Sequence, residues 1–392
     1  MGCSDDGPSP VGPATDTPDG GGGDGSTSDA AKSDGSSGGD GGDAATGEVT
    51  YAATLTGGEE APARVVTTAS GTAKLTLSAD KTKLIYEVKH NVADGTAAHI
   101  HLGEAGEAGA VVFPLKPFSA SMTGSLTVTP ADVANLEAGK LYVNVHGTTN
   151  PNGELRGQIL PPGAALFVAT LTGAQETPAV VTGSTGTSAI ILNAAKTKIR
   201  FHVATTATAT GAHIHRGPAT LSGPVVFPLA PPGATIDGEQ GVTAADVTDL
   251  NEGHFYVNVH TTLNANGEVR GQVLKPGETL YSAALAGTNE VPPVITATTG
   301  GGQFVLTADG KSLRYEISVS GGPAITAGHI HTGGIGVSGP VLYPLTLAPP
   351  GAKGTQAVTA MDVTTLDASG LYVNFHSATN ANGETRGQIT KQ

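Results

Sequence analysis

Apolar and polar residues alternate with a period of two along many short segments of this chain. The alternation is clear over residues 51–56, 71–77, 83–88, 124–128 and 141–145. A segment of this kind turns one apolar face toward a core and one polar face toward solvent, which is typical of a β-strand. Turn residues separate the segments at intervals of roughly 8–12 residues, so the pattern predicts antiparallel β-sandwich domains.

The chain contains three tandem copies of one sequence unit. The motif His-Ile-His recurs at 99–101, 213–215 and 329–331, and the motif Tyr-Val-Asn-Val/Phe-His recurs at 142–146, 256–260 and 372–376. A third motif, Asn-Gly-Glu-x-Arg-Gly-Gln, recurs at 152–158, 266–272 and 382–388. A unit of roughly 115 residues is a whole domain rather than a solenoid repeat. We therefore predict three domains, at 50–161, 165–275 and 279–391.

Each unit is predicted to hold one short helix. In the first unit Thr129 is the expected N-cap, Pro130 the first helical residue and Asp132 the acid that completes a capping box. The pairs Thr243/Asp246 and Thr359/Asp362 repeat this pattern. The domains are therefore expected to be all-β apart from this helix.

Residues 1–48 differ in composition from the rest of the chain. They hold ten Asp or Glu residues against one Lys, and are otherwise mostly Gly, Ser, Thr, Ala and Pro. Such a segment buries too little apolar surface to offset its conformational entropy, so we predict a disordered tether. The net charge of the chain is −14, which argues against nucleic acid as a partner because phosphate binding needs a basic surface. No apolar run is long enough for a transmembrane helix, and a single Cys excludes a disulfide framework.

The chain opens with Met1, Gly2 and Cys3 ahead of the tether. A Gly-Cys pair before a long polar tether resembles the mature start of a bacterial lipoprotein, in which the Cys carries the lipid. The resemblance implies a lipid anchor at Cys3 and an extracytoplasmic location, in the bacterial cell envelope or as a secreted protein. It also implies a signal segment ahead of Cys3, and none stands there in this sequence. Two alternatives stay open. One is an inert Cys3 thiol. The other is myristoylation of Gly2, although that motif prefers Ser or Thr at position 6, where this chain has Asp6.

The recurring histidines form one candidate site in each unit. On a strand, His99 and His101 point to the same face, and Tyr142, Asn144 and His146 share one face of another strand. If the two strands are neighbours, three imidazoles meet, and such a set binds copper or zinc while leaving a position open for water or substrate. The spacing from the first to the third histidine is identical in the three units. The candidate metal ligands, for one ion per unit, are His99, His101, His146, His213, His215, His260, His329, His331 and His376.

A structural alternative stays open for these histidines. Their rings would bond to loop carbonyls, and the neighbouring Asn and Tyr side chains would complete a buried polar network. The remaining histidines, His90, His202 and His254, do not recur and are interpreted as surface residues.

One Glu and one Arg also recur in every unit. The first interpretation is a structural ion pair that pins the first hairpin to the last strand, which would be costly to break if it is buried. The second is a Glu that orients a triad histidine by accepting its other N–H group. The residues concerned are Glu60, Arg156, Glu176, Arg270, Glu290 and Arg386.

These motifs, with Ala-His-Ile-His-Leu-Gly at 98–103, Val-Val-Phe-Pro-Leu at 111–115 and Asn-Gly-Glu-Leu-Arg-Gly-Gln-Ile at 152–159, resemble the chordin-type (CHRD) domain family. The resemblance covers all three units and leaves out the tether. It implies immunoglobulin-like or superoxide-dismutase-like β-sandwiches, without enzymatic activity, in a secreted or surface protein. The His-x-His segment also resembles the copper strand of copper/zinc superoxide dismutases. However, the units lack the further recurring His and Asp that a bridged copper–zinc pair needs.

Together the patterns favour a non-enzymatic, secreted or surface-anchored binding protein that holds copper or zinc, with three copies raising avidity for a multivalent target. The first alternative is an adhesive or structural cell-surface protein whose histidines form hydrogen-bond networks and whose partner is an extracellular protein or glycan. The second is a metal-dependent redox enzyme, although no catalytic Cys and no recurring carboxylate pair supplies a nucleophile and a base. The membrane is expected to be contacted only through a lipid anchor at Cys3.

Overall fold

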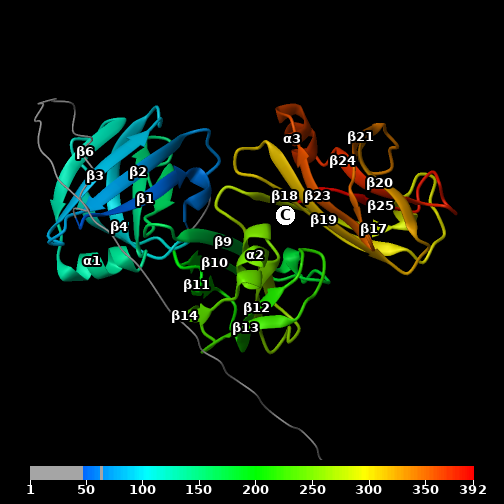
Figure 1. Ribbon diagram of the computed structural model, residues 1–392, viewed down its shortest axis with the longest axis horizontal. Helices are drawn as coiled ribbons and strands as arrows, with labels where there is room; N and C mark the ends of the chain where they lie inside the picture. The colour runs from blue at the N-terminus through cyan, green and yellow to red at the C-terminus, as the bar shows by residue number, and fades with distance from the viewer. Residues whose placement is uncertain (1–46, 62–64) are drawn as a thin grey trace, which may run out of the picture. The chain divides into compact units, whose positions relative to one another are not determined.

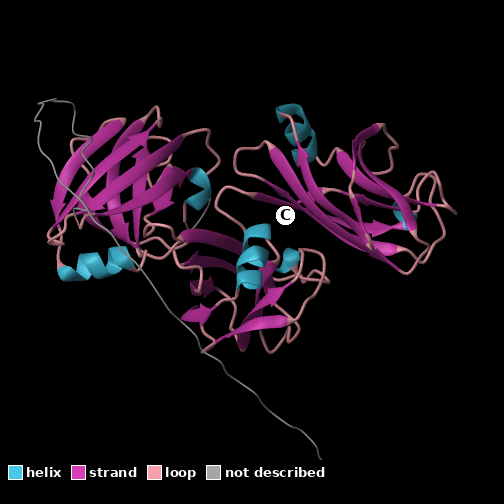
Figure 2. Cartoon of the chain, viewed as in Figure 1, coloured by secondary structure: helices cyan, strands magenta, loops and turns pink. Residues whose placement is uncertain are grey.

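A computed structural model describes residues 47–61 and 65–392 of the chain (Figure 1). The described part consists mainly of antiparallel strands, with one short α-helix in each repeat, so the all-β prediction is confirmed (Figure 2). No helix within these residues is long and apolar enough to cross a membrane. Cys3 and almost all of the predicted tether, 1–48, lie outside the described residues.

The first repeat, blue to green in Figure 1, forms one 8-stranded sheet in the order β5-β4-β7-β8-β1-β2-β3-β6. Its strands are β1 (Val49–Thr56), β2 (Ser70–Leu77), β3 (Lys83–His90), β4 (Gly95–Leu102), β5 (Ala110–Pro114), β6 (Ser121–Thr127), β7 (Leu141–Gly147) and β8 (Leu155–Gln158). A 3-10 turn, η1 (Gly57–Glu59), follows β1. All five segments that alternate in the sequence are therefore strands, with ends that shift by a few residues.

The second and third repeats reproduce this topology. The strands of the second are β9 (Ala165–Thr172), β10 (Thr185–Leu192), β11 (Lys198–Thr205), β12 (Gly211–Arg216), β13 (Val225–Leu229), β14 (Thr235–Gly241), β15 (Phe255–His260) and β16 (Val269–Gln272). Those of the third are β17 (Thr279–Ala286), β18 (Thr299–Leu306), β19 (Ser312–Ser320), β20 (Ile325–Thr332), β21 (Val341–Pro344), β22 (Leu347–Ala348), β23 (Gly351–Ala357), β24 (Leu371–Ser377), β25 (Thr385–Gln388) and β26 (Thr390–Lys391). The 3-10 turns η2 (Gly173–Gln175) and η3 (Gly287–Asn289) correspond to η1.

Each sheet is divided into two halves by a narrow joint. In the first repeat β1 and β8 pair at one position, Thr56 with Arg156. We call β5-β4-β7-β8 the histidine half-sheet and β1-β2-β3-β6 the distal half-sheet, and use the same names for the corresponding strands of the other repeats. Val143 of the histidine half and Leu75 of the distal half are fully buried in one shared core. Each repeat is therefore a β-sandwich whose two layers are halves of one sheet.

The predicted helices are α1 (Pro130–Glu137), α2 (Ala244–Glu252) and α3 (Ala360–Asp367). At the start of α1 the Thr129 hydroxyl accepts a bond from the Asp132 backbone N–H, and the Asp132 carboxylate accepts one from the Thr129 N–H. The same capping box is present in α2 and α3. Because it pairs otherwise unpaired N–H groups at the helix start, it fixes where each helix begins. The prediction is confirmed in all three repeats.

Candidate metal centre

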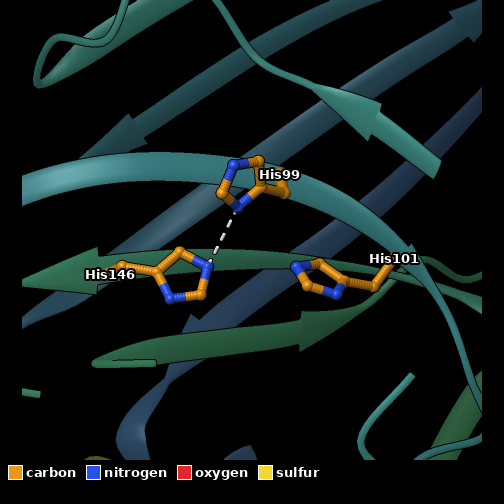
Figure 3. A group of neighbouring side chains, drawn as sticks. All are labelled: His99, His101 and His146. Carbon is orange, nitrogen blue, oxygen red and sulfur yellow. Dashed lines mark hydrogen bonds between the residues drawn. The ribbon is translucent and has the colours of Figure 1, made fainter. Parts of the chain in front are cut away.

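Strand register brings the three histidines of each repeat together. On β4, His99 and His101 flank Ile100, which is fully buried in the core. The antiparallel neighbour β7 places His146 opposite Ala97, on the same face as the histidine pair. Figure 3 shows the three rings of the first repeat facing a common space. In every repeat the candidate ligand atoms lie within 4.8 Å of one another, so the triads predicted from the sequence exist in the fold.

A hydrogen bond joins the first histidine of each triad to the third. His99 Nδ1 lies 3.1 Å from His146 Nε2, and the corresponding distance is 3.0 Å in the second and third repeats. The other nitrogen of His146, Nδ1, lies 3.1 Å from the carbonyl oxygen of Pro151 and must carry a proton to donate to it. His146 therefore presents the lone pair of Nε2 to the site, and Nδ1 of His99 donates to it.

The second histidine of each triad has a ring nitrogen without a partner. His101 Nδ1 donates to the carbonyl oxygen of Gly109 at 2.9 Å, which leaves the lone pair on Nε2. This Nε2 is buried and forms no hydrogen bond among the described residues, and the same is true of His215 and His331. Buried polar atoms are normally paired. The same unpaired Nε2 in all three repeats is consistent with a nitrogen that binds a partner from outside the chain.

Burial favours the neutral form of eight triad histidines. Burial lowers the pKa of His99, His101 and His146 below the ordinary histidine value. Burial is also the largest cause of the lowered pKa values of His213, His215, His260, His329 and His331. Because a metal binds the unprotonated nitrogen, these shifts keep the lone pairs available at neutral pH.

A stack of three flat groups contains the second histidine. The His101 ring lies 4.9 Å from the Tyr142 ring at an angle of 14°, and the guanidinium carbon of Arg156 lies 3.5 Å from the Tyr142 centroid. Since β7 runs between β4 and β8, His101 and Arg156 flank Tyr142 from opposite sides. The other repeats have the same stacks, at 4.9 and 3.5 Å and at 4.8 and 3.4 Å. The stack fixes the plane of the His101 ring.

One residue that positions this histidine was missed in the sequence. Gly109 accepts from the His101 ring through its carbonyl oxygen and donates its own N–H to the Tyr142 hydroxyl at 2.9 Å. A Cβ at this position would overlap the carbonyl oxygen of Leu102, so only glycine fits. Gly223 and Gly339 hold the corresponding positions, eight residues after the second histidine of each triad. That constant spacing was a signal available from the sequence.

The recurring Glu and Arg do not form the direct ion pair expected from the sequence. Glu60 accepts from the Asn144 side chain at 3.2 Å, whereas Arg156 donates to the carbonyl oxygens of Glu104, at 2.6 Å, and Glu107. Glu60 does not hold a triad histidine either, because the ring N–H groups bond to carbonyls or to each other. The same separation is found for Glu176 and Arg270, and for Glu290 and Arg386. The loop carbonyls take up the guanidinium donors that an ion pair would have used.

Burial strongly shifts the pKa values of the recurring carboxyl groups. Glu60, Glu176 and Glu290 are 7–8% exposed. Burial raises the pKa of each to about 7, although Asn144 and the nearby Arg156 oppose the shift at Glu60. These carboxyl groups therefore keep their proton to a higher pH than an ordinary glutamate does.

The interpretation of the non-recurring histidines as surface residues is wrong. His90 and His202 are 8% and 4% exposed, and the His254 side chain is 12% exposed. The His90 ring stacks on Phe118, and His202 Nδ1 lies 2.7 Å from the Asp237 carboxylate. These histidines have partners within the fold and belong to no histidine triad, although His254 lies close to Glu252 and Glu316.

The molecule is thus a tandem of three β-sandwiches, each with a histidine triad on one outer face. The family model described as CHRD domain matches residues 51–159, 167–273 and 281–389. These matches cover most of the chain, which therefore belongs to the CHRD domain family, in three tandem copies. No curated protein matches the chain. A solved structure titled "The Structure of Intact Ap-TbpB (N and C lobes)" has 10% identity over 88% of this chain and 77% of that chain, with a TM-score of 0.13, too low to carry an argument.

Proposed function

We propose that this protein is a non-enzymatic binding protein, secreted or anchored at the cell surface, that holds one copper or zinc ion in each histidine triad. The observation that carries the proposal is the buried, unpartnered Nε2 of the second histidine, present in all three repeats. The Nε2 lone pair of the third histidine faces the same space. His99 Nδ1 would complete the set once its ring proton shifts to Nε2. Three such nitrogen ligands suit copper and zinc and leave a coordination position open.

The backbone around each triad supports a resident ion. The carbonyl oxygens of Gly109 and Pro151 fix the tautomers of His101 and His146, so that Nε2 of both rings carries the lone pair. The lone pair of His146 accepts from His99 until an ion takes its place. Carbonyl groups of this kind commonly orient metal-binding histidines. A bound ion would supply Lewis acidity and an open coordination position. In the described residues of the first repeat, the triad rings form hydrogen bonds only to one another and to carbonyl oxygens.

The experiment is a metal titration of the full chain, purified without a nickel column. We expect about three equivalents of copper or zinc, lost as the pH falls and the imidazoles are protonated. The substitutions His101→Ala, His215→Ala and His331→Ala should each remove one equivalent. His90→Gln is the matched control, because His90 lies outside the triads and should leave the stoichiometry unchanged. Absence of bound metal at micromolar supply would refute the proposal.

A second candidate function, adhesion to an extracellular protein or glycan, has one observation in its favour. A fully exposed aliphatic side chain stands in the same loop of each repeat, as Val66, Val181 and Ile295. Repeated exposure of an apolar residue is common at contact surfaces. The combined change Val66→Asp, Val181→Asp and Ile295→Asp should abolish attachment to a cell or matrix surface if adhesion is the function, and should leave metal binding unchanged.

The proposed location rests on Cys3. If the lipoprotein resemblance is correct, mass spectrometry of the N-terminal peptide from native membranes should find the Cys3 thiol acylated. An unmodified Cys3 in the native protein would leave secretion as the remaining form of this proposal.

A further inference from the structure

Each repeat buries a second acceptor atom that has no partner. The side-chain oxygen Oδ1 of Asn144, like that of Asn258 and of Asn374, is buried and forms no hydrogen bond among the described residues. These asparagines are only 4–5% exposed. A buried amide oxygen is normally paired, and leaving it unpaired costs stability. The same unpaired oxygen in three repeats indicates a donor from outside the chain.

Strand register places this asparagine among the triad histidines. Asn144 stands opposite His99 in the pairing of β4 with β7, and the second and third repeats have the same pairing. On β7 it lies between Tyr142 and His146, and alternate residues of a strand share one face. Residues directly opposite each other in antiparallel strands have Cβ atoms about 5 Å apart. Asn144 therefore lies on the face where the three imidazoles meet.

The recurring glutamate orients the amide group of this asparagine. Asn144 Nδ2 donates to both carboxylate oxygens of Glu60, at 3.2 Å, and the other repeats have the corresponding bonds. Glu60 follows β1 and η1, and β1 lies beyond β8 in the sheet, on the side away from β4. Since Oδ1 and Nδ2 leave one carbon atom in different directions, Oδ1 is turned toward β4 and the triad. An ionised carboxylate can only accept, so it holds the amide in this orientation.

The donor that stands opposite Asn144 on β8 does not pair with Oδ1. This donor is Arg156, whose two Nη groups donate to the carbonyl oxygens of Glu104 and Glu107. Its Nε–H group is itself unpaired and forms no bond to Oδ1. The nearby carboxylates, once ionised, can only accept. In the part of the chain that the structure describes, Oδ1 therefore lacks a donor.

Two unpaired acceptors thus lie on one face of each repeat, His101 Nε2 and Asn144 Oδ1 in the first. A copper or zinc ion would pair the imidazole nitrogen, because imidazole suits both ions. An amide oxygen suits magnesium, calcium or manganese better than copper or zinc. Oδ1 instead calls for an O–H or N–H group close to the ion. A ligand in the open coordination position can supply that group.

We propose that Asn144, Asn258 and Asn374 each accept a hydrogen bond from the fourth ligand of the bound ion, so that the open position selects a ligand with a proton to donate. This inference rests on the proposed function and adds to it the class of the exchangeable ligand. A water molecule meets the requirement, and so does an amine or hydroxyl group of a larger molecule. A bare anion such as azide offers only lone pairs to Oδ1 and is disfavoured. The asparagine is a positioning residue, because it holds the fourth ligand and not the ion.

The first test is a crystal structure of the unmodified full chain loaded with zinc. We expect a water molecule on each ion, with its oxygen about 2.6–3.2 Å from the asparagine Oδ1. Coordination of the ion by Oδ1 itself would overturn the inference, and so would a water on Oδ1 that does not touch the ion. Both results would leave the proposed function standing. Absence of zinc from all three triads would overturn both.

The second test measures the selectivity of the second triad alone. His101→Ala and His331→Ala silence the first and third triads, and the full chain is loaded with copper(II) at pH 8. The copper(II)–azide charge-transfer band then reports how tightly azide displaces the water molecule. Asn258→Leu keeps the approximate size of the side chain and removes Oδ1, so azide should bind more tightly.

Glu176→Gln is the matched control for charge. Asn258→Leu also removes the donor to Glu176 and so favours the neutral form of this carboxyl group, which by itself helps an anion to bind. Glu176→Gln removes that charge completely and keeps Oδ1, so it gives the upper limit of the charge effect. We expect azide to bind about fivefold more tightly in Asn258→Leu than in Glu176→Gln, the equivalent of one hydrogen bond. Equal azide affinities in two variants that both hold one equivalent of copper would overturn the inference.

Discussion

The two half-sheets of each repeat differ in which residues the three copies share. In the distal half-sheet the copies agree on the inward face: β3, β11 and β19 bury an aromatic residue at one position, Tyr86, Phe201 and Tyr315. The outward-facing residues just before it are Ile85, Arg200 and Arg314. Those just after it are Glu87, His202 and Glu316. Packing of the core accounts for the inward agreement and places no demand on the outward face.

In the histidine half-sheet the copies agree on both faces. The inward residue Val143 has Val257 and Val373 as counterparts, and all three are fully buried. The outward Tyr, Asn and His of β7 are identical in β15 and β24. Core packing cannot explain the outward agreement, since these side chains lie on the other face. The difference between the half-sheets indicates that the outer face of the histidine half is under a separate constraint. The buried contacts of Tyr142 and Asn144 lie on this face together with the triad.

The largest effect that would test this comparison concerns Arg156. Arg156→Met should lower the free energy of unfolding of the first repeat by about 4 kcal/mol, because two buried carbonyl oxygens lose their donor and the contact with Tyr142 is lost. Hydrogen exchange of β7 and β8 measures the loss. Lys83→Met is the control, since Lys83 is exposed on the distal half-sheet, and it should change stability by no more than about 0.5 kcal/mol. Similar costs for the two variants would remove the distinction between the half-sheets.

The second effect is a dependence of stability on pH that the buried carboxyl groups beside the histidine half should cause. Glu60, Glu176 and Glu290 have folded-state pKa values of about 7, above the ordinary value of 4.5. A raised pKa means that the folded state binds more protons than the unfolded state. The stabilisation from each carboxyl group is therefore fully present below about pH 4.5 and is lost as the pH rises through 7. Each carboxyl group should contribute a fall of about 3 kcal/mol over that interval.

The measurement is denaturant unfolding between pH 5 and pH 8 for the unmodified chain and for the triple variant Glu60→Gln, Glu176→Gln and Glu290→Gln. The difference between the two curves isolates the carboxyl groups from the triad histidines, whose lowered pKa values act in the opposite direction. Glu87→Gln, on the distal half-sheet, should leave the pH dependence unchanged. A triple variant that keeps the full alkaline loss of stability would show that the carboxyl groups do not cause it.

Much of the fold could be predicted because its signals are local. Period-two alternation located five of the eight strands of the first repeat, and the Thr129–Asp132 capping box located its helix, since each signal depends on neighbours in sequence. The convergence of His99, His101 and His146 was predictable once β4 and β7 were assumed adjacent. The partners of Glu60 and Arg156 were not, because they depend on how a loop of carbonyl oxygens folds over the sheet. The burial of His202 was missed because its partner Asp237 lies on another strand and recurs in no other repeat.

A smaller effect is expected at the tyrosine hydroxyl. Tyr256→Phe keeps the ring stacked between His215 and Arg270 but removes the oxygen that accepts the Gly223 N–H at 3.0 Å. One neutral hydrogen bond contributes about 1 kcal/mol, so stability should fall by about that amount. The Gly223 amide should exchange its hydrogen faster, while the stack and the copper or zinc stoichiometry remain. Unchanged protection of this amide would show that the hydroxyl does not hold the loop that orients His215.

The smallest effect is expected where the other two repeats already carry the replacement residue. Ile85→Arg puts on β3 the residue that Arg200 and Arg314 hold at the same outward position of β11 and β19. Ile85 is 48% exposed, so the change neither opens a cavity nor buries a charge. Stability should stay within about 0.5 kcal/mol, and the metal stoichiometry should not change. A large loss in this variant would mean that the distal outer face is constrained as tightly as the triad face. The agreement among the three triads would then no longer point to a site, since every outward position would resist substitution for reasons of folding alone.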